Sequence, residues 1–275
     1  MLRSLYSGIS GMRGFQIKLD VIANNIANVN TIGFKAGRVM FKDMLSQTMA
    51  GVTAPTDERG GVNPKQVGLG VTIGSIDTIH TGGSAMTTNV ATDLRIDGDG
   101  FFAIAPTADV EVAYLTRAGN FTIDANRNLV TMDGMFVLSV DGDIITLDED
   151  VNAFTIGMDG TIIAVNADGT TEDTGLQIGV VKVTNPGALE KIGNSLYRFT
   201  PNADAEGESA LDLLFPPNDP EEGTGAIISG QLEMSNVDLT TEFTEMIVAQ
   251  RGFQANSRII TTSDEILQEV VNLKR

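Results

Sequence analysis

The sequence contains no cysteine and no tryptophan, and His80 is its single histidine. Without cysteine, the chain forms neither a disulfide framework nor a thiol site. With one histidine, it cannot assemble the usual zinc ligands, and any serine–histidine pair would have to use His80 itself. We therefore interpret His80 as a packing or surface residue. We expect no catalytic, metal or cofactor site, and no enzyme activity.

Long apolar runs are also missing, although 42% of the residues are hydrophobic. No run approaches the ~20 residues that cross a membrane, so we expect no membrane insertion. Near the N-terminus, Ser7, Gly8 and Gly11 interrupt the apolar residues, which argues against a signal peptide. If the protein leaves the cytoplasm, we expect export by a route without a cleaved signal.

Positive charge is scarce in the middle of a chain whose net charge is −18. Residues 44–236 hold eight Lys/Arg against 28 Asp/Glu, whereas residues 1–43 hold six against two and residues 237–275 four against six. Phosphate contacts need lysine and arginine, so this balance argues against nucleic acid as a partner. The simplest interpretation is a solvated acidic outer face.

Each end of the chain does carry a seven-residue apolar repeat. At the start the repeat is Leu5, Met12, Leu19 and Ile26. At the end it is Leu239, Met246, Phe253, Ile260 and Leu267. This spacing keeps one helix stripe facing a partner over many turns. We predict helices over residues 3–28 and from Asp238 or Thr240 to about residue 273, paired in a coiled coil.

More apolar residues occur than one pair of helices can bury. Ile9, Phe243 and Val271 fall on the alternate seam, and Ile22 adds to a second apolar face. Exposed apolar faces of this kind favour association with further copies. We predict self-assembly through the residues of both repeats and these four. An intramolecular helix pair that only closes the domain is the alternative.

Between the two predicted helices, the residue composition changes twice along the chain. Residues 44–75 are rich in glycine and proline and predict a long loop. Residues 76–236 contain short runs rich in Val, Ile, Thr and Phe, with Asp-Gly pairs at 133, 141, 159 and 168, which predict antiparallel strands and tight hairpins. Residues 201–225 predict a surface loop.

These patterns predict an α+β fold with three regions. Residues 1–32 and 237–275 would form the helical coiled-coil core. Residues 33–75 would be a Gly-rich connecting segment, in which Gly33 ends the first helix in left-handed geometry. Residues 76–236 would form an outer, mainly antiparallel β domain.

Both ends also resemble a known family. The stretches are Leu19–Asn28 and Thr31–Lys35 at the start, with Ser235–Leu239 and Met246–Arg251 at the end. They are similar to the terminal signatures of bacterial flagellar rod and hook proteins. The motif residues are Asn24, Asn25, Asn28, Gly33, Phe34, Asn236, Asp238, Ala249, Gln250 and Arg251.

Within this family, Val67-Gly-Leu-Gly70 and Val271-Asn-Leu-Lys274 look more like the hook branch. Longer hook proteins carry an additional outer domain, for which this chain has no room, so it resembles a short hook protein. The distal rod protein also has a short chain without this additional domain, and it is the alternative.

The hook resemblance implies a structural subunit of a flexible helical tube. That tube transmits torque from rod to filament as a universal joint and encloses the export channel. The implied partners are further copies of the chain, the distal rod protein, the hook cap protein, the hook–filament junction protein and the flagellar export apparatus. The implied location is the bacterial flagellum, in the hook and basal body, outside the cell.

Two other classes remain open from the residues alone. A secreted β-domain binding module on a coiled-coil stalk would be expected to expose aromatic side chains, yet the chain has no Trp and only three Tyr. An acidic glycosidase would need two carboxylates at a defined separation.

Overall fold

The computed structural model describes residues 2–56, 59–108, 110, 112–148, 151–166, 170–205 and 209–273. The chain divides into two compact units. Unit 1 comprises Met1–Ala27, Gly37–Thr78 and Asp238–Arg275, and unit 2 comprises Asn28–Ala36 and Ile79–Val237. The backbone therefore passes between the units four times, at 27/28, 36/37, 78/79 and 237/238. No helix of the described residues is both long and apolar enough to span a membrane.

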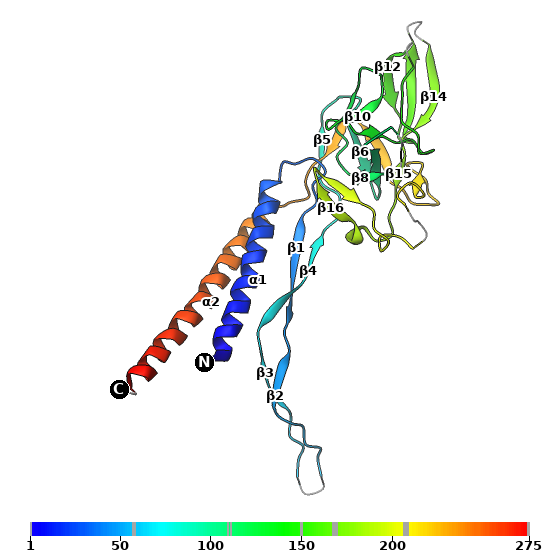
Figure 1. Ribbon diagram of the computed structural model, residues 1–275. Helices are drawn as coiled ribbons and strands as arrows, with labels where there is room; N and C mark the ends of the chain where they lie inside the picture. Colours follow the sequence, from blue (N-terminus) through cyan, green and yellow to red (C-terminus); the bar gives the residue numbers. More distant parts are fainter. Residues whose placement is uncertain are drawn as a thin grey trace. The chain divides into compact units, whose positions relative to one another are not determined.

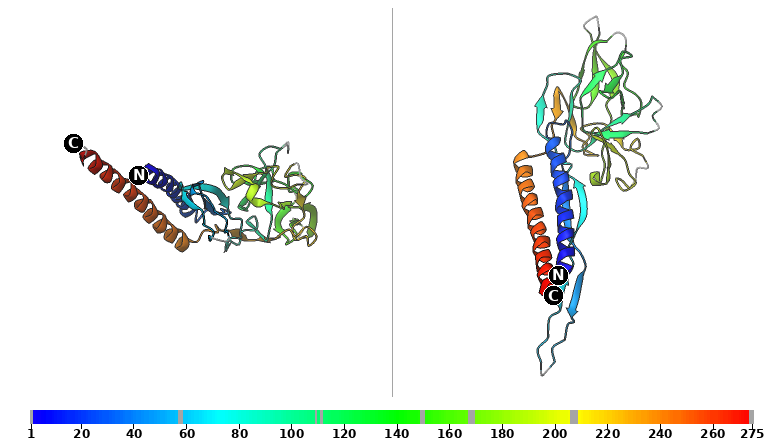
Figure 2. Two further views of the ribbon diagram at one scale, coloured as in Figure 1. Left: turned by 90° about the horizontal axis from the view of Figure 1, so that it is seen from below. Right: turned by 60° about the vertical axis from the view of Figure 1, so that its left-hand side comes forward.

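Unit 1 contains both predicted terminal helices, α1 (Leu2–Ala27) and α2 (Leu239–Leu273). They lie side by side and antiparallel, so the two chain ends lie at the same end of the pair (Figures 1 and 2). Asp238 caps α2 as predicted, since its carboxylate accepts the Thr240 N–H at 2.9 Å and the Thr241 hydroxyl at 2.8 Å.

The end of α1 differs from the expectation. Gly33 has the predicted left-handed backbone, with φ +66, but the helix already stops at Ala27. Gly33 instead belongs to the turn that follows, where an added Cβ would lie 2.6 Å from the Ala118 nitrogen. Glycine is therefore required at this position both by its conformation and by the close approach of the backbone.

The connecting segment, including the predicted loop at residues 44–75, instead forms paired strands. They are β1 (Gly37–Asp43), β2 (Ser46–Ala50), β3 (Lys65–Gly68) and β4 (Val71–Thr78). β1 pairs with β4, β2 pairs with β3, and the hairpin continues past the N-terminal end of α1 (Figure 1). The strand pairing satisfies the backbone while β2 and β3 stay exposed, so no apolar alternation marks these strands in the sequence.

Unit 2 is built from short antiparallel strands. They are β5 (Ala85–Thr87), β6 (Leu94–Asp97), β7 (Phe101–Ala105), β8 (Tyr114–Thr116), β9 (Phe121–Ile123), β10 (Leu129–Thr131), β11 (Phe136–Val137), β12 (Val151–Ile156), β13 (Thr161–Asn166), β14 (Thr171–Gln177), β15 (Val180–Val181), β16 (Glu190–Gly193), β17 (Leu196–Arg198), β18 (Leu214–Phe215), β19 (Ala226–Ser229) and β20 (Gln231–Glu233), with a 3₁₀ turn at Pro186–Ala188. The α+β prediction is confirmed.

The largest sheet runs in the order β16-β17-β8-β7-β11-β10-β9, and β15 and β18 join it beside β7. β7 is buried along its whole length. Phe102 and Ile104 enter one core cluster, and Phe101 and Ala103 enter the other. Because successive side chains of a strand point to opposite faces, β7 separates two cores.

Smaller pairings complete unit 2: β12-β13-β14, β6-β19 and β5-β20. Gly134 joins β10 to β11 and Gly160 joins β12 to β13, both with positive φ, as the Asp-Gly pairs predict. The pair at 168–169 lies outside the described residues. The predicted 201–225 loop includes β18, which pairs with β15.

Candidate functional site

The two terminal helices touch where they carry glycine. Gly8 faces Ile260, and a Cβ at Gly11 would lie 2.9 Å from the Asn256 amide. A Cβ at Gly252 would lie 2.6 Å from the Phe15 ring. Glycine costs a helix about 1 kcal/mol relative to alanine. Here the close approach of the two helices offsets that cost.

Asn25 joins both helices to the hairpin and is only 1% exposed. Its Nδ2 donates to the Gly37 carbonyl at 2.8 Å and to Glu242 Oε1 at 2.9 Å, while its Oδ1 accepts the Gly37 N–H at 3.0 Å. Lys18 and Glu245 add an ion pair between the helices. Asn25 thereby fixes the position of α1 against both α2 and β1.

The residues predicted for self-assembly are only partly covered within one chain. Ile22 is buried. The half-buried residues are Leu5, Met12, Leu19, Ile26, Met246, Ile260 and Leu267. The exposed residues are Ile9, Leu239, Phe243, Phe253 and Val271. On α2 the buried positions are Ala249 and Ser263, and Ile260 packs against Gly8, whereas Phe243, Phe253 and Val271 stay exposed.

Unit 1 exposes further apolar side chains. On α2 they are Ile247, Val248, Ile259, Ile266, Val270 and Leu273. On the hairpin they include Met40, Met44, Leu45, Met49, Val52 and Val62. Single exposed apolar residues are common on proteins, but a surface of this extent is typical of a protein–protein interface.

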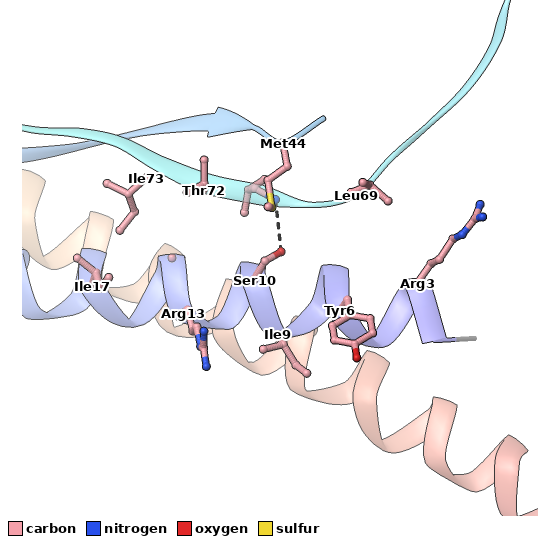
Figure 3. A pocket seen from close by; sticks show the side chains of 12 residues that line it. Arg3, Tyr6, Ile9, Ser10, Arg13, Ile17, Met44, Leu69, Thr72 and Ile73 are labelled. Atoms are coloured by element: carbon pink, nitrogen blue, oxygen red, sulfur yellow. Dashed lines mark hydrogen bonds between the residues drawn. The ribbon is translucent and has the colours of Figure 1, made fainter. Parts of the chain in front are cut away.

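A groove of about 600 Å³ lies between α1 and the hairpin. Figure 3 shows residues of the helix on one side of it and Met44, Leu69, Thr72 and Ile73 of the hairpin on the other. Its helix side chains include Arg3, Tyr6, Ile9, Ser10, Arg13 and Ile17. The Ser10 hydroxyl accepts the Val71 N–H at 3.4 Å and so links the two walls (Figure 3).

Unit 2 contains a buried ionic cluster centred on Glu233. Its Oε1 lies 2.6 Å from Lys35 Nζ and accepts the Gly83 N–H at 2.8 Å, and its Oε2 lies 3.3 Å from Arg117 Nη1. Burial by itself would raise the pKa of Glu233. The charges of Arg117 and Lys35 and the Gly83 N–H outweigh that effect and hold this pKa below its ordinary value.

Asn236 extends this cluster. Its Oδ1 accepts the Ala36 N–H at 2.7 Å, and its Nδ2 donates to the Ile79 carbonyl at 2.8 Å. The Gly33 N–H donates to the Glu233 carbonyl at 2.8 Å. We call Lys35, Arg117, Glu233 and Asn236 the junction cluster, because they join the segments of unit 2 that continue into unit 1.

The remaining motif residues have varied surroundings. Phe34 is buried, and Lys191 Nζ lies 3.8 Å from its ring centroid. Asn28 accepts the Thr31 N–H at its carbonyl, 3.2 Å away. Ala249 is fully buried, whereas Asn24, Gln250 and Arg251 are exposed.

His80 packs against the Phe101 and Tyr197 rings, with centroid distances of 5.7 and 5.5 Å. Burial, and then the charges of Lys35, Arg117 and Lys191, lower its pKa to about 4. The imidazole is thus neutral near pH 7, and the packing interpretation is confirmed. Among the described residues, no three His, Cys, Asp or Glu side chains gather as metal ligands would.

Sequence reasoning missed the roles of Glu233, Arg117 and the helix glycines. A carboxylate inside the Gln231-Leu-Glu-Met run was an available signal, because a buried strand position rarely holds an unpaired charge. Gly8, Gly11 and Gly252 sit at helical spacings on the inner faces, but their contacts require both helices to be placed.

Small-residue helix pairing, an exposed apolar surface and an inserted β unit together define a structural protein built for assembly. Three family models match the chain: "Flagella basal body rod protein" over residues 5–35, "Flagellar hook protein FlgE/F/G D1 domain" over 95–164, and "Flagellar basal body rod FlgEFG protein C-terminal" over 228–273. The chain belongs to this flagellar rod and hook family, whose members are structural proteins and not enzymes.

Rod proteins match along the whole chain. The flagellar basal-body rod protein FlgG of Bacillus subtilis (strain 168) is 58% identical over 276 residues, which covers 100% of both chains. FlgG of Borreliella burgdorferi is 40% identical over 278 residues, again with 100% of both covered.

Hook proteins match over a shorter part. The flagellar hook protein FlgE of Borreliella burgdorferi is 55% identical over 130 residues, which is 47% of this chain and 29% of the hook protein. The predicted family is confirmed. Within it, these matches favour the distal rod alternative over the hook interpretation.

Proposed function

We propose that the chain is a subunit of the distal rod of the bacterial flagellum. Many copies would polymerise through the terminal helices into a helical tube around the export channel. The observation that carries this proposal is the similarity to rod proteins from end to end, at 58% identity in the B. subtilis case. The hook protein of Borreliella burgdorferi matches 47% of the chain, and that of Helicobacter mustelae 50%.

The organisation of unit 1 supports polymerisation. Phe243, Phe253 and Val271 are exposed on α2, with Phe243 50% and Val271 65% exposed. Each leucine- or phenylalanine-sized side chain covered in a polymer contributes about 1.5–3 kcal/mol, so a few such residues provide a substantial driving force.

The rod proposal changes the expected neighbours. The subunit would contact other copies of itself and the hook protein at the outer end of the rod. The hook cap and hook–filament junction proteins would not be its direct partners. Passage through the flagellar export apparatus stays part of the proposal.

Removing the gene from the source bacterium tests rod against hook. Electron microscopy of isolated basal bodies should show shortened rods without hooks, and restoring the gene should restore both. Full-length rods that lack only the hook would overturn the proposal and favour the hook interpretation. Purified protein provides a second test, since straight tubes support a rod and curved tubes support a hook.

A further inference from the structure

We propose that the groove between α1 and the hairpin receives the C-terminal half of α2 from a second copy of the chain. This contact rests on the proposed function, because it assigns one interface within the polymer. The pairing of α1 with α2 in the same chain is a separate contact.

The groove faces away from the chain's own α2. Each helical residue turns the side chain by about 100°, so Tyr6 and Arg13 lie on the side of α1 opposite Gly8 and Gly11. Those glycines contact α2, whereas Tyr6 is 69% exposed. The groove is therefore open to a different copy.

The C-terminal half of α2 presents a matching surface. Ile259, Ile266, Val270 and Leu273 follow one another at spacings of seven, four and three residues, which places them on one stripe. Each is at least 43% exposed. We call these residues the α2 stripe.

The groove and the α2 stripe have the same length. Ile259 and Leu273 are 14 residues apart, and so are Arg3 and Ile17 at the two ends of the groove wall. At 1.5 Å per residue, each surface extends about 21 Å along its helix. One helix can thus cover the other over the whole contact.

The acidic side chains beside the α2 stripe are opposite in charge to the arginines of the groove, and one arginine, Arg258, lies at the start of the stripe. Arg3 and Arg13 line the groove, and Glu265 and Glu269 lie beside the α2 stripe on the exposed face. Among the described residues, none of these four side chains takes part in an ion pair. Complementary charge of this kind orients an apolar contact and disfavours wrong registers.

The proposed contact would propagate. The groove and the α2 stripe are different surfaces, so each copy could accept one neighbour and dock into another. A head-to-tail contact of this type gives an open helical array when its rotation does not close a ring.

Cysteine cross-linking tests the contact directly, because the chain has no native cysteine. Tyr6→Cys or Ile9→Cys would be combined with Ile266→Cys or Val270→Cys in the full-length chain. On oxidation, assembled protein should give a ladder of disulfide-linked multimers, since a disulfide needs Cα atoms about 4.4–6.8 Å apart. Lys42→Cys with Ile266→Cys is the control, because Lys42 is exposed on the hairpin but does not line the groove. The absence of a ladder in all four pairs, or an equal ladder in the control, overturns the proposal.

Charge reversal provides an independent test. Arg3→Glu/Arg13→Glu should reduce polymer mass at least tenfold, as should Glu265→Arg/Glu269→Arg, and the four changes together should restore it. Lys42→Glu/Lys65→Glu changes the net charge as much as the groove variant, and both residues are exposed outside the groove, so near-normal assembly is expected. Equal loss in this control, or no rescue by the combined variant, contradicts the contact.

The same experiments separate this inference from the proposed function. If the unaltered chain forms tubes but the groove variants form them equally well, the groove contact is wrong and the rod proposal stands. If gene removal leaves the rods intact, the rod proposal is wrong whatever the cross-links show.

Discussion

At the scale of single residues, Glu233 is the side chain on which most of the junction cluster depends. Its side chain is 2% exposed, and its single negative charge is shared by two buried cations, Lys35 and Arg117. A buried ion pair adds little compared with well-packed apolar residues, but removing one partner leaves an uncompensated charge. The cluster therefore specifies which chain segments meet more than it adds stability.

Glu233→Gln should destabilise unit 2 by about 3–5 kcal/mol, because both cations lose their counter-charge in a dry site. Urea unfolding followed by Tyr fluorescence measures this, since Tyr114 and Tyr197 both lie in unit 2. Glu190→Gln is the control. It breaks the exposed pair with Arg198, and a far smaller change is expected because solvent screens this pair. Equal effects of the two variants would contradict the role of the cluster.

His80 should titrate near pH 4, and proton NMR can follow it without ambiguity because it is the single histidine. An unfolded histidine titrates near pH 6.5, so the unfolded state binds more protons between pH 6.5 and 4. Stability should therefore fall as the pH is lowered through this window. His80→Phe, which keeps the ring packing, should flatten that part of the curve. The loss of stability that begins below about pH 4.5, as Glu233 with its lowered pKa becomes protonated, should remain. An NMR pKa near 6.5 would contradict the buried environment.

At the scale of elements, the helix pair gains its closeness from residues that are poor helix formers. Gly11 and Gly252 lie on facing sides of α1 and α2 and leave no room for a side chain. The pairing, more than helix propensity, then holds each helix in place. This explains why a helix with three glycines in its first half can persist.

Gly252→Val should separate the helices, because its Cβ would approach the Phe15 ring to about 2.6 Å. We expect loss of helical circular dichroism on heating at a lower temperature, with unit 2 unfolding unchanged. Gly8→Ala is the matched control. Its Cβ would sit at 3.4 Å from Ile260, and alanine favours the helix by about 1 kcal/mol, so unchanged or higher stability is expected. If both variants behave alike, the close contact at Gly252 is not what holds the pair.

At the scale of the whole molecule, the terminal helices and the β unit could be predicted from periodicity and turn residues. β7 (Phe101–Ala105) is one of the short apolar runs within residues 76–236 that predict strands, and it is buried on both faces. The hairpin could not be predicted in this way. Its strands bury almost nothing, so Ser46–Ala50 and Lys65–Gly68 show no pattern that sets them apart from a loop.

The assembly residues were predicted by type, but their division into inner and outer faces was not. Periodicity cannot tell Ile22, which is buried, from Ile9, which is exposed, because both fit an apolar helix face. The two hook-like motifs, at 67–70 and 271–274, span only four residues each. The similarity to a rod protein over the full chain therefore outweighs them. One of these motifs ends at Lys274, which lies outside the described residues.

Phe253→Asp should block assembly while the chain itself stays folded, because the ring is 36% exposed and a carboxylate there would have to be buried in any polymer contact. Sedimentation would measure polymer mass, and circular dichroism would confirm the fold. Gln254→Asp, at the neighbouring exposed position, is the control and should assemble. Normal tubes from the Phe253 variant would remove this residue from the interface.

The four backbone crossings between unit 1 and unit 2 have a mechanical consequence. Two parts joined by one linker can swivel freely, and one cut releases them. Here four backbone connections join the two units. Rotation of one unit against the other would twist these connections around one another, and cleavage of one connection by a protease leaves three intact. A twisting load on either unit is thus divided among four covalent connections, and the junction cluster anchors the segments on the unit 2 side.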